Sequence, residues 1–264
     1  IITAASLKLA PIPATIGTAV IVVPSPQAAL DLLGLARAQI GDGISAFELI
    51  DGQGLAFLSE ALPQIRQQFD ARPDWYVLIE VGLAKGLEPE AVLSDLFEAA
   101  FEAGVASDGL IAQSEAQRTE FWTVREQIPE ANRRIGSVAS HDVSIPISLI
   151  PEFIVRANKA VAKIGAFRVN CFGHLGDGNL HFNIFPTIGH SRAEYGAQSR
   201  KIKRALHDLV DEMDGSVSAE HGIGRMKVAD LERYGDPVGL DIMRAIKGAL
   251  DPNGIMNPGA VLRA

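Results

Sequence analysis

The sequence predicts an α+β fold built from two ferredoxin-like β-α-β-β-α-β units, each an antiparallel sheet with helices on one face, followed by a helical C-terminal tail. Strand-like runs rich in β-branched residues alternate with amphipathic segments, and the same order of elements occurs twice. The 264 residues, 47% of them hydrophobic, suffice for a sizeable core. The repeat is one of element order and not of residue identity.

The first unit is expected in the N-terminal part of the chain. Pro24 and Pro26 precede its first helix, and Glu88-Pro89-Glu90 places a proline and acidic residues at the start of its second. A short helix near 54–69 is expected between the two middle strands. The expected elements are strand 18–23, helix 27–39, strands 45–50 and 75–82, helix 88–103 and strand 108–113.

A polar helix at 113–134 is expected to lead into the second unit. After that unit, 228–250 has the pattern of a helix and ends in the turn-rich "DPNGIMNPG". The expected elements of the second unit are strand 141–147, helix 149–164, strands 166–172 and 179–185, helix 191–213 and a short strand at 215–219.

Composition excludes several classes of partner. The net charge is −8 and no segment concentrates Lys and Arg, so neither nucleic acid nor an anionic membrane surface is an expected partner. Cys171 is the only cysteine, which excludes an intramolecular disulfide and indicates a reducing compartment, with the cytoplasm as the expected location. The apolar run "TAVIVVP" is far shorter than the ~20 residues of a spanning helix. The chain opens on the strand-like "IITAASLKLAP" without Met, so we expect a piece cut from a longer protein.

The stretch "CFGHLGDGNLHFNIF" predicts a β-hairpin that carries two histidines. Asp177-Gly178 is typical of a two-residue type I′ turn, and that register places His174 directly opposite His181. Facing Cβ atoms lie ~4.5–5.5 Å apart, so both imidazoles could bind one ion. The other face of the hairpin is expected to contribute core residues, namely Leu175, Leu180 and Phe182.

A second candidate segment is "SAEHGIGRMK", in which Glu220 and His221 directly follow a predicted strand. Loops at strand ends often carry catalytic groups. Two histidines and one carboxylate would leave open positions on a divalent ion, as a catalytic metal site requires. The alternative is that the histidines are structural, and spacing alone does not show that the two segments meet.

Three motifs, "GHLGDGNLHFN", "SAEHGIG" and "DPNGIMNPGAVL", resemble the C-terminal half of the FAD-linked oxidases that include D-lactate, glycolate and D-2-hydroxyglutarate dehydrogenases. The resemblance extends over the whole chain. It implies that 1–14 end the FAD-binding domain, that 15–250 form the substrate and metal domain, and that 251–264 form a flavin-facing tail. It also implies oxidation of a D-2-hydroxy acid to the 2-oxo acid by hydride transfer to FAD, with this chain inactive until the FAD domain is supplied.

The resemblance further implies a role for individual residues. A 2-hydroxy acid can chelate a metal through its hydroxyl and one carboxylate oxygen, and an arginine offers a planar fork to the carboxylate. The implied roles are metal binding, Zn or Mn, by His174, His181 and Glu220; proton abstraction by His221; substrate binding by Arg125 of "FWTVREQIPEA" and by Asn183; and cofactor contact by Asn257.

Two departures bear on the substrate. The 2-hydroxyglutarate enzymes carry a threonine where this chain has Pro129, and many members carry a lysine where it has Ser140. Both residues help hold a distal carboxylate in that subgroup. We therefore expect a different or shorter 2-hydroxy acid unless His141 or Arg133 substitutes, and its identity stays open. The electron acceptor, whether a quinone, a cytochrome or an electron-transfer flavoprotein, also stays open. We expect that the protein can form a homodimer.

Two alternative functions follow from the same residues. A free-standing metal hydrolase would use an ion held by His174, His181 and Glu220 to activate water, with His221 as acid or base. A non-catalytic dimerisation module would instead keep the histidines for structural reasons.

Overall fold

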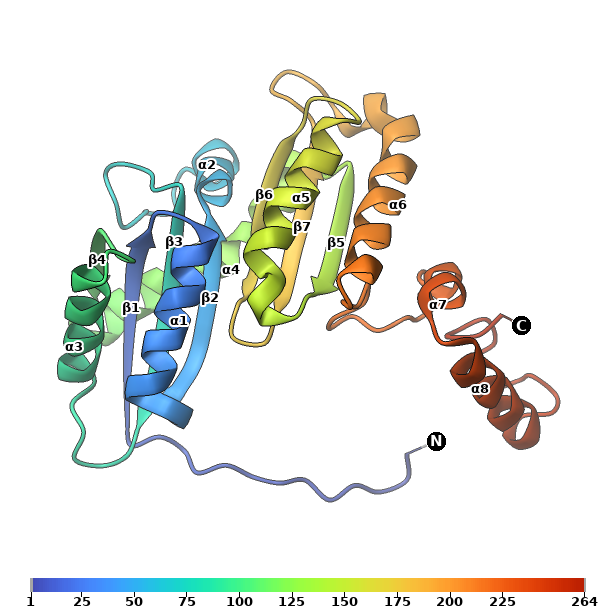
Figure 1. Cartoon of the computed structure of the whole chain (residues 1–264), viewed down its shortest axis with the longest axis horizontal. Helices are drawn as coiled ribbons and strands as arrows, with labels where there is room; N and C mark the ends of the chain where they lie inside the picture. The colour runs from blue at the N-terminus through green and yellow to red at the C-terminus, as the bar shows by residue number, and fades with distance from the viewer. Residues whose placement is uncertain (1, 264) are drawn as a thin grey trace.

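The computed structural model describes residues 2–263. Ile1, the first residue of the predicted segment 1–14, and Ala264, the last residue of the predicted segment 251–264, lie outside the described residues. A single antiparallel sheet runs through the molecule in the strand order β4-β1-β3-β2-β6-β7-β5 (Figure 1). The mixed α+β class is thus confirmed. The strands are β1 (Thr15–Val23), β2 (Ile44–Asp51), β3 (Trp75–Leu83), β4 (Asp108–Ile111), β5 (Ala139–Ser144), β6 (Arg168–His174) and β7 (Asn179–Phe185).

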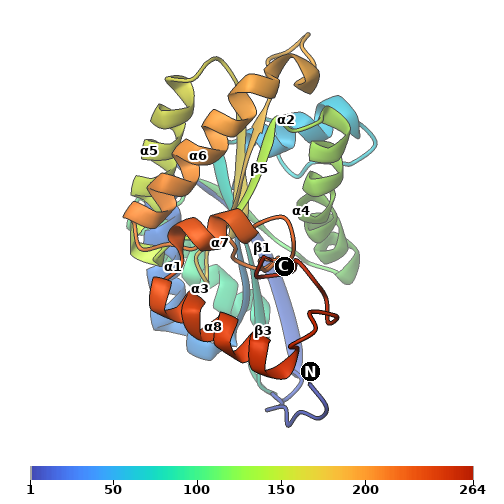
Figure 2. The ribbon, with the colours of Figure 1, turned by 90° about the vertical axis from the view of Figure 1, so that its right-hand side faces the viewer.

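Helices cover both faces of this sheet (Figure 2). One core cluster packs α1, α3, α5 and α6 on one face, and a second packs α2 and α4 on the other. The last two helices, α7 and α8, extend away from the sheet beyond β5 and α6 (Figure 1). The helices are α1 (Pro26–Ile40), α2 (Gly52–Ala61), α3 (Pro89–Glu102), α4 (Glu115–Ile135), α5 (Ile150–Ala162), α6 (Gly196–Glu212), α7 (Val228–Tyr234) and α8 (Pro237–Leu250).

The expectation of two separate sheets is wrong. Strands β2 and β6 pair antiparallel, with Glu48 opposite His174 and Ile50 opposite Phe172, and this pairing joins the two halves. The strand expected at 215–219 is also absent from the described residues, where a single bridge joins Ser144 to Ser216. The Ser216 hydroxyl donates to the Ser218 carbonyl and accepts from its N–H, so a local turn replaces the ladder.

Both ends of the chain also differ from expectation. The segment 2–13 forms no strand, although its sequence begins with strand-like residues. The helix expected over 228–250 is interrupted between α7 and α8, because Pro237 begins α8 and Asp236 caps it by accepting the N–H groups of Val238 and Gly239.

Helix α4 places part of the candidate site against the sheet. Ser114 caps its N-terminus by accepting the N–H of Gln117, and Gly136, at φ 85°, ends it. Its buried stripe follows helical spacing through Phe121, Val124, Arg125 and Ile128. An arginine within this stripe is directed into the protein and not into solvent.

Asp51 fastens the two halves of the sheet together at the end of the β2–β6 pairing. One carboxylate oxygen caps α2 by accepting the N–H of Gln53 at 2.6 Å, and the other accepts the N–H of Cys171 in β6 at 3.4 Å. Burial raises the pKa of Asp51 from 3.8 to about 6 despite these two hydrogen bonds. Keeping Asp51 ionised at this junction therefore costs folding free energy, and the size of that cost depends on pH.

The raised pKa of Asp51 predicts that the stability of the protein depends on pH. Because the folded-state pKa of Asp51 lies above its ordinary value, the neutral acid favours the folded state, and this stabilisation is lost as pH rises through about 6. Relative to Asp51→Asn, the wild-type free energy of unfolding should fall by up to about 3 kcal/mol between about pH 4 and about pH 7. Urea titrations across this range measure the difference. The exposed Asp95→Asn is the control, and parallel curves for wild type and Asp51→Asn would contradict the assignment.

Candidate metal and substrate site

The β6–β7 hairpin brings its two histidines together in a register different from the predicted one. Phe172, and not His174, faces His181 across the ladder. The turn spans four residues, 175–178, and the His174 carbonyl accepts the N–H groups of Asp177 and Gly178. The register therefore differs from expectation by two residues. Because side chains alternate with a period of two, both imidazoles still share one face, and their ring centroids lie 6.0 Å apart.

The longer turn has a packing reason. Leu175, inside the turn, is fully buried, as are Leu180 and Phe182, which confirms these three as core residues. Gly178 has φ 85° and lies against the backbone of Ile145, where an added Cβ would collide with the carbonyl oxygen. Burial of Leu175 and this close approach together favour the wider turn over a two-residue turn at Asp177-Gly178.

Glu220 meets the two histidines, so the structure brings the predicted ligand trio together. Its Oε1 lies 3.0 Å from Nε2 of His174, and one donor atom from each of His174, His181 and Glu220 lies within 4.8 Å of the others. Two imidazole nitrogens and one carboxylate oxygen are a donor set that Zn²⁺ and related divalent ions accept. The residues present thus fit the metal that the sequence resemblance implies.

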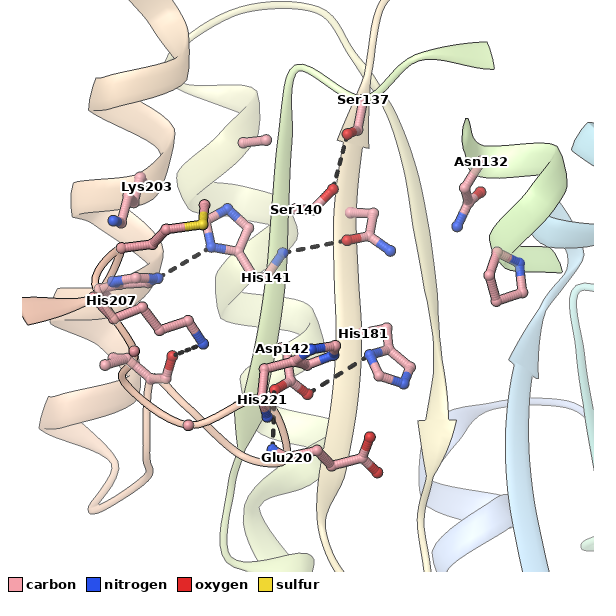
Figure 3. A pocket seen from close by; sticks show the side chains of 18 of the residues that line it. Asn132, Ser137, Ser140, His141, Asp142, His181, Lys203, His207, Glu220 and His221 are labelled. Atoms are coloured by element: carbon pink, nitrogen blue, oxygen red, sulfur yellow. Dashed lines mark hydrogen bonds and ion pairs between the residues drawn. The ribbon is translucent and has the colours of Figure 1, made fainter. Parts of the chain in front are cut away.

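Asp142 of β5 holds the loop that carries Glu220 and His221. Its Oδ2 accepts the N–H groups of Glu220 at 3.0 Å and His221 at 3.2 Å. Its Oδ1 accepts from the Asn179 amide at 2.7 Å and lies 3.7 Å from Nδ1 of His181 (Figure 3). Sequence reasoning missed Asp142, although a lone carboxylate in the strand "HDVSIPI" was a signal.

Arg125 is buried beside the candidate metal ligands and is not free on the surface of its helix. Its Nε donates to Oε2 of Glu48 at 2.7 Å, and its guanidinium carbon lies 4.8 Å from the centre of the Phe172 ring. Within residues 2–263 its Nη groups donate to no acceptor. Oε1 of Glu48 lies 2.5 Å from Nδ1 of His174. Glu48 was also missed, although it is the one charged residue in the strand-like run "SAFELI".

These contacts set the protonation of the site. Burial raises the pKa of Glu48, but the hydrogen bond from His174 and the charge of Arg125 outweigh it, so the net pKa is lowered. The same hydrogen bond raises the pKa of His174. Burial, together with the charge of Arg125, lowers the pKa of His181, so its imidazole is neutral at neutral pH.

A cleft with a volume of about 1090 Å³ opens beside the ligand trio, at the β5 edge of the sheet between α4 and α6. His181, Asn183, Glu220 and His221 line it, whereas Arg125 and His174 are not among its lining residues. The Asn183 side-chain oxygen accepts the backbone N–H of His141 at 3.2 Å. Asn257, which was predicted to contact the cofactor, is not among the residues that line the cleft. Its side-chain oxygen accepts a hydrogen bond from Arg225.

Pro129 and Ser140, the two departures noted in the sequence, both line this cleft, as do the two residues considered as substitutes for them. Arg133 is paired with Glu130 through two hydrogen bonds of 2.7 and 2.8 Å. Burial lowers the pKa of His141 to about 3, so its ring is neutral. Neither residue offers an unpaired positive charge.

Beyond His141 the cleft wall holds a polar chain that the sequence did not reveal. Nδ1 of His141 lies 3.3 Å from Nε2 of His207 (Figure 3). Nδ1 of His207 lies 3.3 Å from Asp230. Lys203 pairs with the same carboxylate at 2.8 Å. These residues come from β5, α6 and α7, so only the folded chain brings them together.

Comparison with known proteins identifies the family. The model of the family described as "FAD linked oxidases, C-terminal domain" matches residues 12–261. The chain belongs to this family. Among solved structures, p-cresol methylhydroxylase with substrate bound is similar at a TM-score of 0.65 and 11% identity, covering 95% of this chain and 53% of that one. At that identity the likeness concerns the fold alone.

Curated relatives are similar over most of this chain. A protein of Oryza sativa subsp. japonica named "Probable D-2-hydroxyglutarate dehydrogenase, mitochondrial" is 34% identical over 88% of this chain and 40% of its own length. The D-2-hydroxyglutarate dehydrogenase of Xanthomonas citri pv. viticola is 32% identical over 98% and 54%. A putative mitochondrial D-lactate dehydrogenase of Schizosaccharomyces pombe is 30% identical over 93% and 48%. The chain therefore spans about half the length of these relatives.

Two of these names place the relative in mitochondria, so the comparisons do not support the cytoplasmic expectation for this chain. Among the described residues, every helix is too short or too polar to cross a membrane.

The site geometry predicts that Asp142 controls the order of the loop at 218–222. Hydrogen bonds to a charged acceptor contribute about 1.5–3 kcal/mol, so Asp142→Ala should speed amide exchange at Glu220 and His221 by at least about tenfold. Hydrogen–deuterium exchange measures this directly. Asp108→Ala, at an exposed strand end, is the control, and unchanged exchange at 218–222 would show that Asp142 does not hold the loop.

Proposed function

We propose that this chain is the substrate- and metal-binding part of a flavin-dependent dehydrogenase that oxidises a D-2-hydroxy acid to the 2-oxo acid. The observation that carries the proposal is the convergence of His174, His181 and Glu220 beside His221, in a member of the FAD-linked oxidase family. Relatives named for D-2-hydroxyglutarate and D-lactate support the substrate class.

His174, His181 and Glu220 would hold a divalent ion, Zn²⁺ or Mn²⁺. When bound, the ion supplies a positive charge that lowers the pKa of a coordinated hydroxyl. Three protein donors leave positions for the substrate hydroxyl and one carboxylate oxygen. The neutral His181 and the Nε2 atom of His174 suit this role.

The other residues of the site would bind and deprotonate the substrate. His221, on the cleft wall, would accept the hydroxyl proton while the hydride leaves the substrate Cα. Arg125 would offer its unengaged Nη groups to the substrate carboxylate, and Asn183 would donate its amide to the bound acid. Asn257 would contact the FAD bound mainly by the rest of the protein, a cofactor that would supply the hydride acceptor.

The cleft favours a substrate without a second carboxylate. Pro129 and Ser140 supply no positive charge, Arg133 is paired with Glu130, and His141 is neutral. Three other cations line the cleft, but each is already engaged, with Asp230, with Asn257 and with a backbone carbonyl respectively: Lys203, Arg225 and Lys227. A distal carboxylate beside Pro129 and Ser140 would therefore be desolvated without a free cation to pair with. We therefore propose a D-2-hydroxy acid with a short or uncharged tail.

The first test uses the full-length protein that contains this chain. It should be yellow, contain a divalent metal and reduce a dye with a D-2-hydroxy acid. His181→Ala should lose the metal and at least about 100-fold in kcat/KM, since a metal ligand is removed. His190→Ala, an exposed histidine paired with Glu194, is the control. Metal-dependent ester or phosphate hydrolysis without flavin would contradict the proposal.

The substrate preference has its own test. Ser140→Lys should raise the kcat/KM for D-2-hydroxyglutarate by about tenfold over Ser140→Met, because a charged hydrogen bond to a carboxylate contributes about 1.5–3 kcal/mol. Met matches the length of lysine without its charge. Equal activity of the two variants toward this acid would show that the cleft wall at Ser140 does not face the substrate tail.

A further inference from the structure

We propose that Glu48 is a positioning residue that orients the metal ligand His174 and the substrate-binding Arg125 through a single carboxylate. This inference rests on the proposed function. Glu48 belongs to β2, in the first half of the chain, whereas His174 lies on β6 in the second half and Arg125 on α4. The carboxylate thus joins three elements at the point where the halves of the sheet meet.

The register of the sheet makes Glu48 the direct neighbour of His174. The two residues face each other in the β2–β6 ladder, and Oε1 of Glu48 lies 2.5 Å from Nδ1 of His174. Glu48 is only 3% exposed, so water does not compete for its oxygens. The contact is consequently fixed by backbone pairing and burial.

This contact selects the nitrogen that is left for a metal. An ionised carboxylate only accepts hydrogen bonds, so Nδ1 of His174 carries a proton toward Glu48. The lone pair available for coordination is then on Nε2, the atom that lies 3.0 Å from Glu220. Carboxylates that hold the second nitrogen of a ligating histidine in this way fix its tautomer and raise its basicity.

The second oxygen of Glu48 performs the same task for Arg125. It accepts a hydrogen bond from the Nε–H of Arg125 at 2.7 Å, and the guanidinium group packs over the Phe172 ring. The Nη groups are left to bind a carboxylate with a defined orientation. Without Glu48 the arginine would be a buried charge without its partner.

A second glutamate on the sheet, Glu80, allows the proposed role of Glu48 to be distinguished from a purely structural ion pair with α4. Glu80 of β3 also pairs with an α4 arginine, Arg118, at 2.9 Å and accepts the indole N–H of Trp122. All of these contacts use Oε2 of Glu80. Attaching α4 to the sheet therefore needs one oxygen, whereas Glu48 uses its other oxygen on a metal ligand. Glu80 is the matched control.

The test is Zn²⁺ affinity in metal-stripped full-length protein, measured by competition with a chelator. Glu48→Gln should weaken Zn²⁺ binding by about 10–100-fold, whereas Glu80→Gln should change it by less than about threefold. X-ray absorption at the zinc edge should show two imidazole ligands in wild type and fewer in Glu48→Gln. Wild-type affinity and two imidazoles in Glu48→Gln would overturn the inference. Absence of Zn²⁺ binding by the wild type would instead refute the proposed metal site itself.

Loss of stability in Glu48→Gln is addressed by a second variant. Replacing Glu48 alone leaves the buried charge of Arg125 without a partner. The double substitution Glu48→Gln/Arg125→Met removes that charge as well, so the double variant should fold. We expect this variant to keep a cooperative thermal transition and still bind Zn²⁺ about 10–100-fold more weakly than the wild type. Recovery of wild-type affinity in the double variant would show that Glu48 does not act through His174.

Discussion

The pairing of β2 with β6 is the constraint on which the rest of the site depends. It turns two halves of similar element order into one seven-stranded sheet and sets Glu48 opposite His174. Asp51 closes the end of the same pairing by accepting the N–H of Cys171. His174, one of the candidate metal ligands, is therefore positioned by a contact from a residue more than a hundred positions earlier in the chain.

Electrostatics at this junction divides the two histidines into different roles. His174 shares a proton with a buried carboxylate, whereas burial and the nearby Arg125 keep His181 neutral. Across the edge strand, Asp142 fixes the loop that brings Glu220 to them. Three carboxylates thus surround one small site: Glu220 as a proposed metal ligand, Glu48 as the proposed orienting group, and Asp142 as the anchor of the loop.

Local sequence patterns were sufficient for most of the elements and for placing the two histidines on one face. The family resemblance, and not spacing, added Glu220 to them, and neither predicted how the elements pair. Alternation placed His174 and His181 on one face, and that survived a register error because the error was an even number of residues. Turn chemistry at Asp177-Gly178 suggested the tighter hairpin, and burial of Leu175 prevailed over it. Glu48, Asp142 and the chain from His141 to Asp230 depend on contacts between distant segments, which spacing along the sequence does not encode.

The metal proposed for this site should be required for oxidation of a D-2-hydroxy acid. The direct measurement is the bleaching of flavin absorbance in metal-stripped full-length protein, mixed with a D-2-hydroxy acid and titrated with Zn²⁺ or Mn²⁺. We expect no bleaching without metal and full recovery at one ion per chain. Bleaching at an undiminished rate in the stripped protein would contradict it.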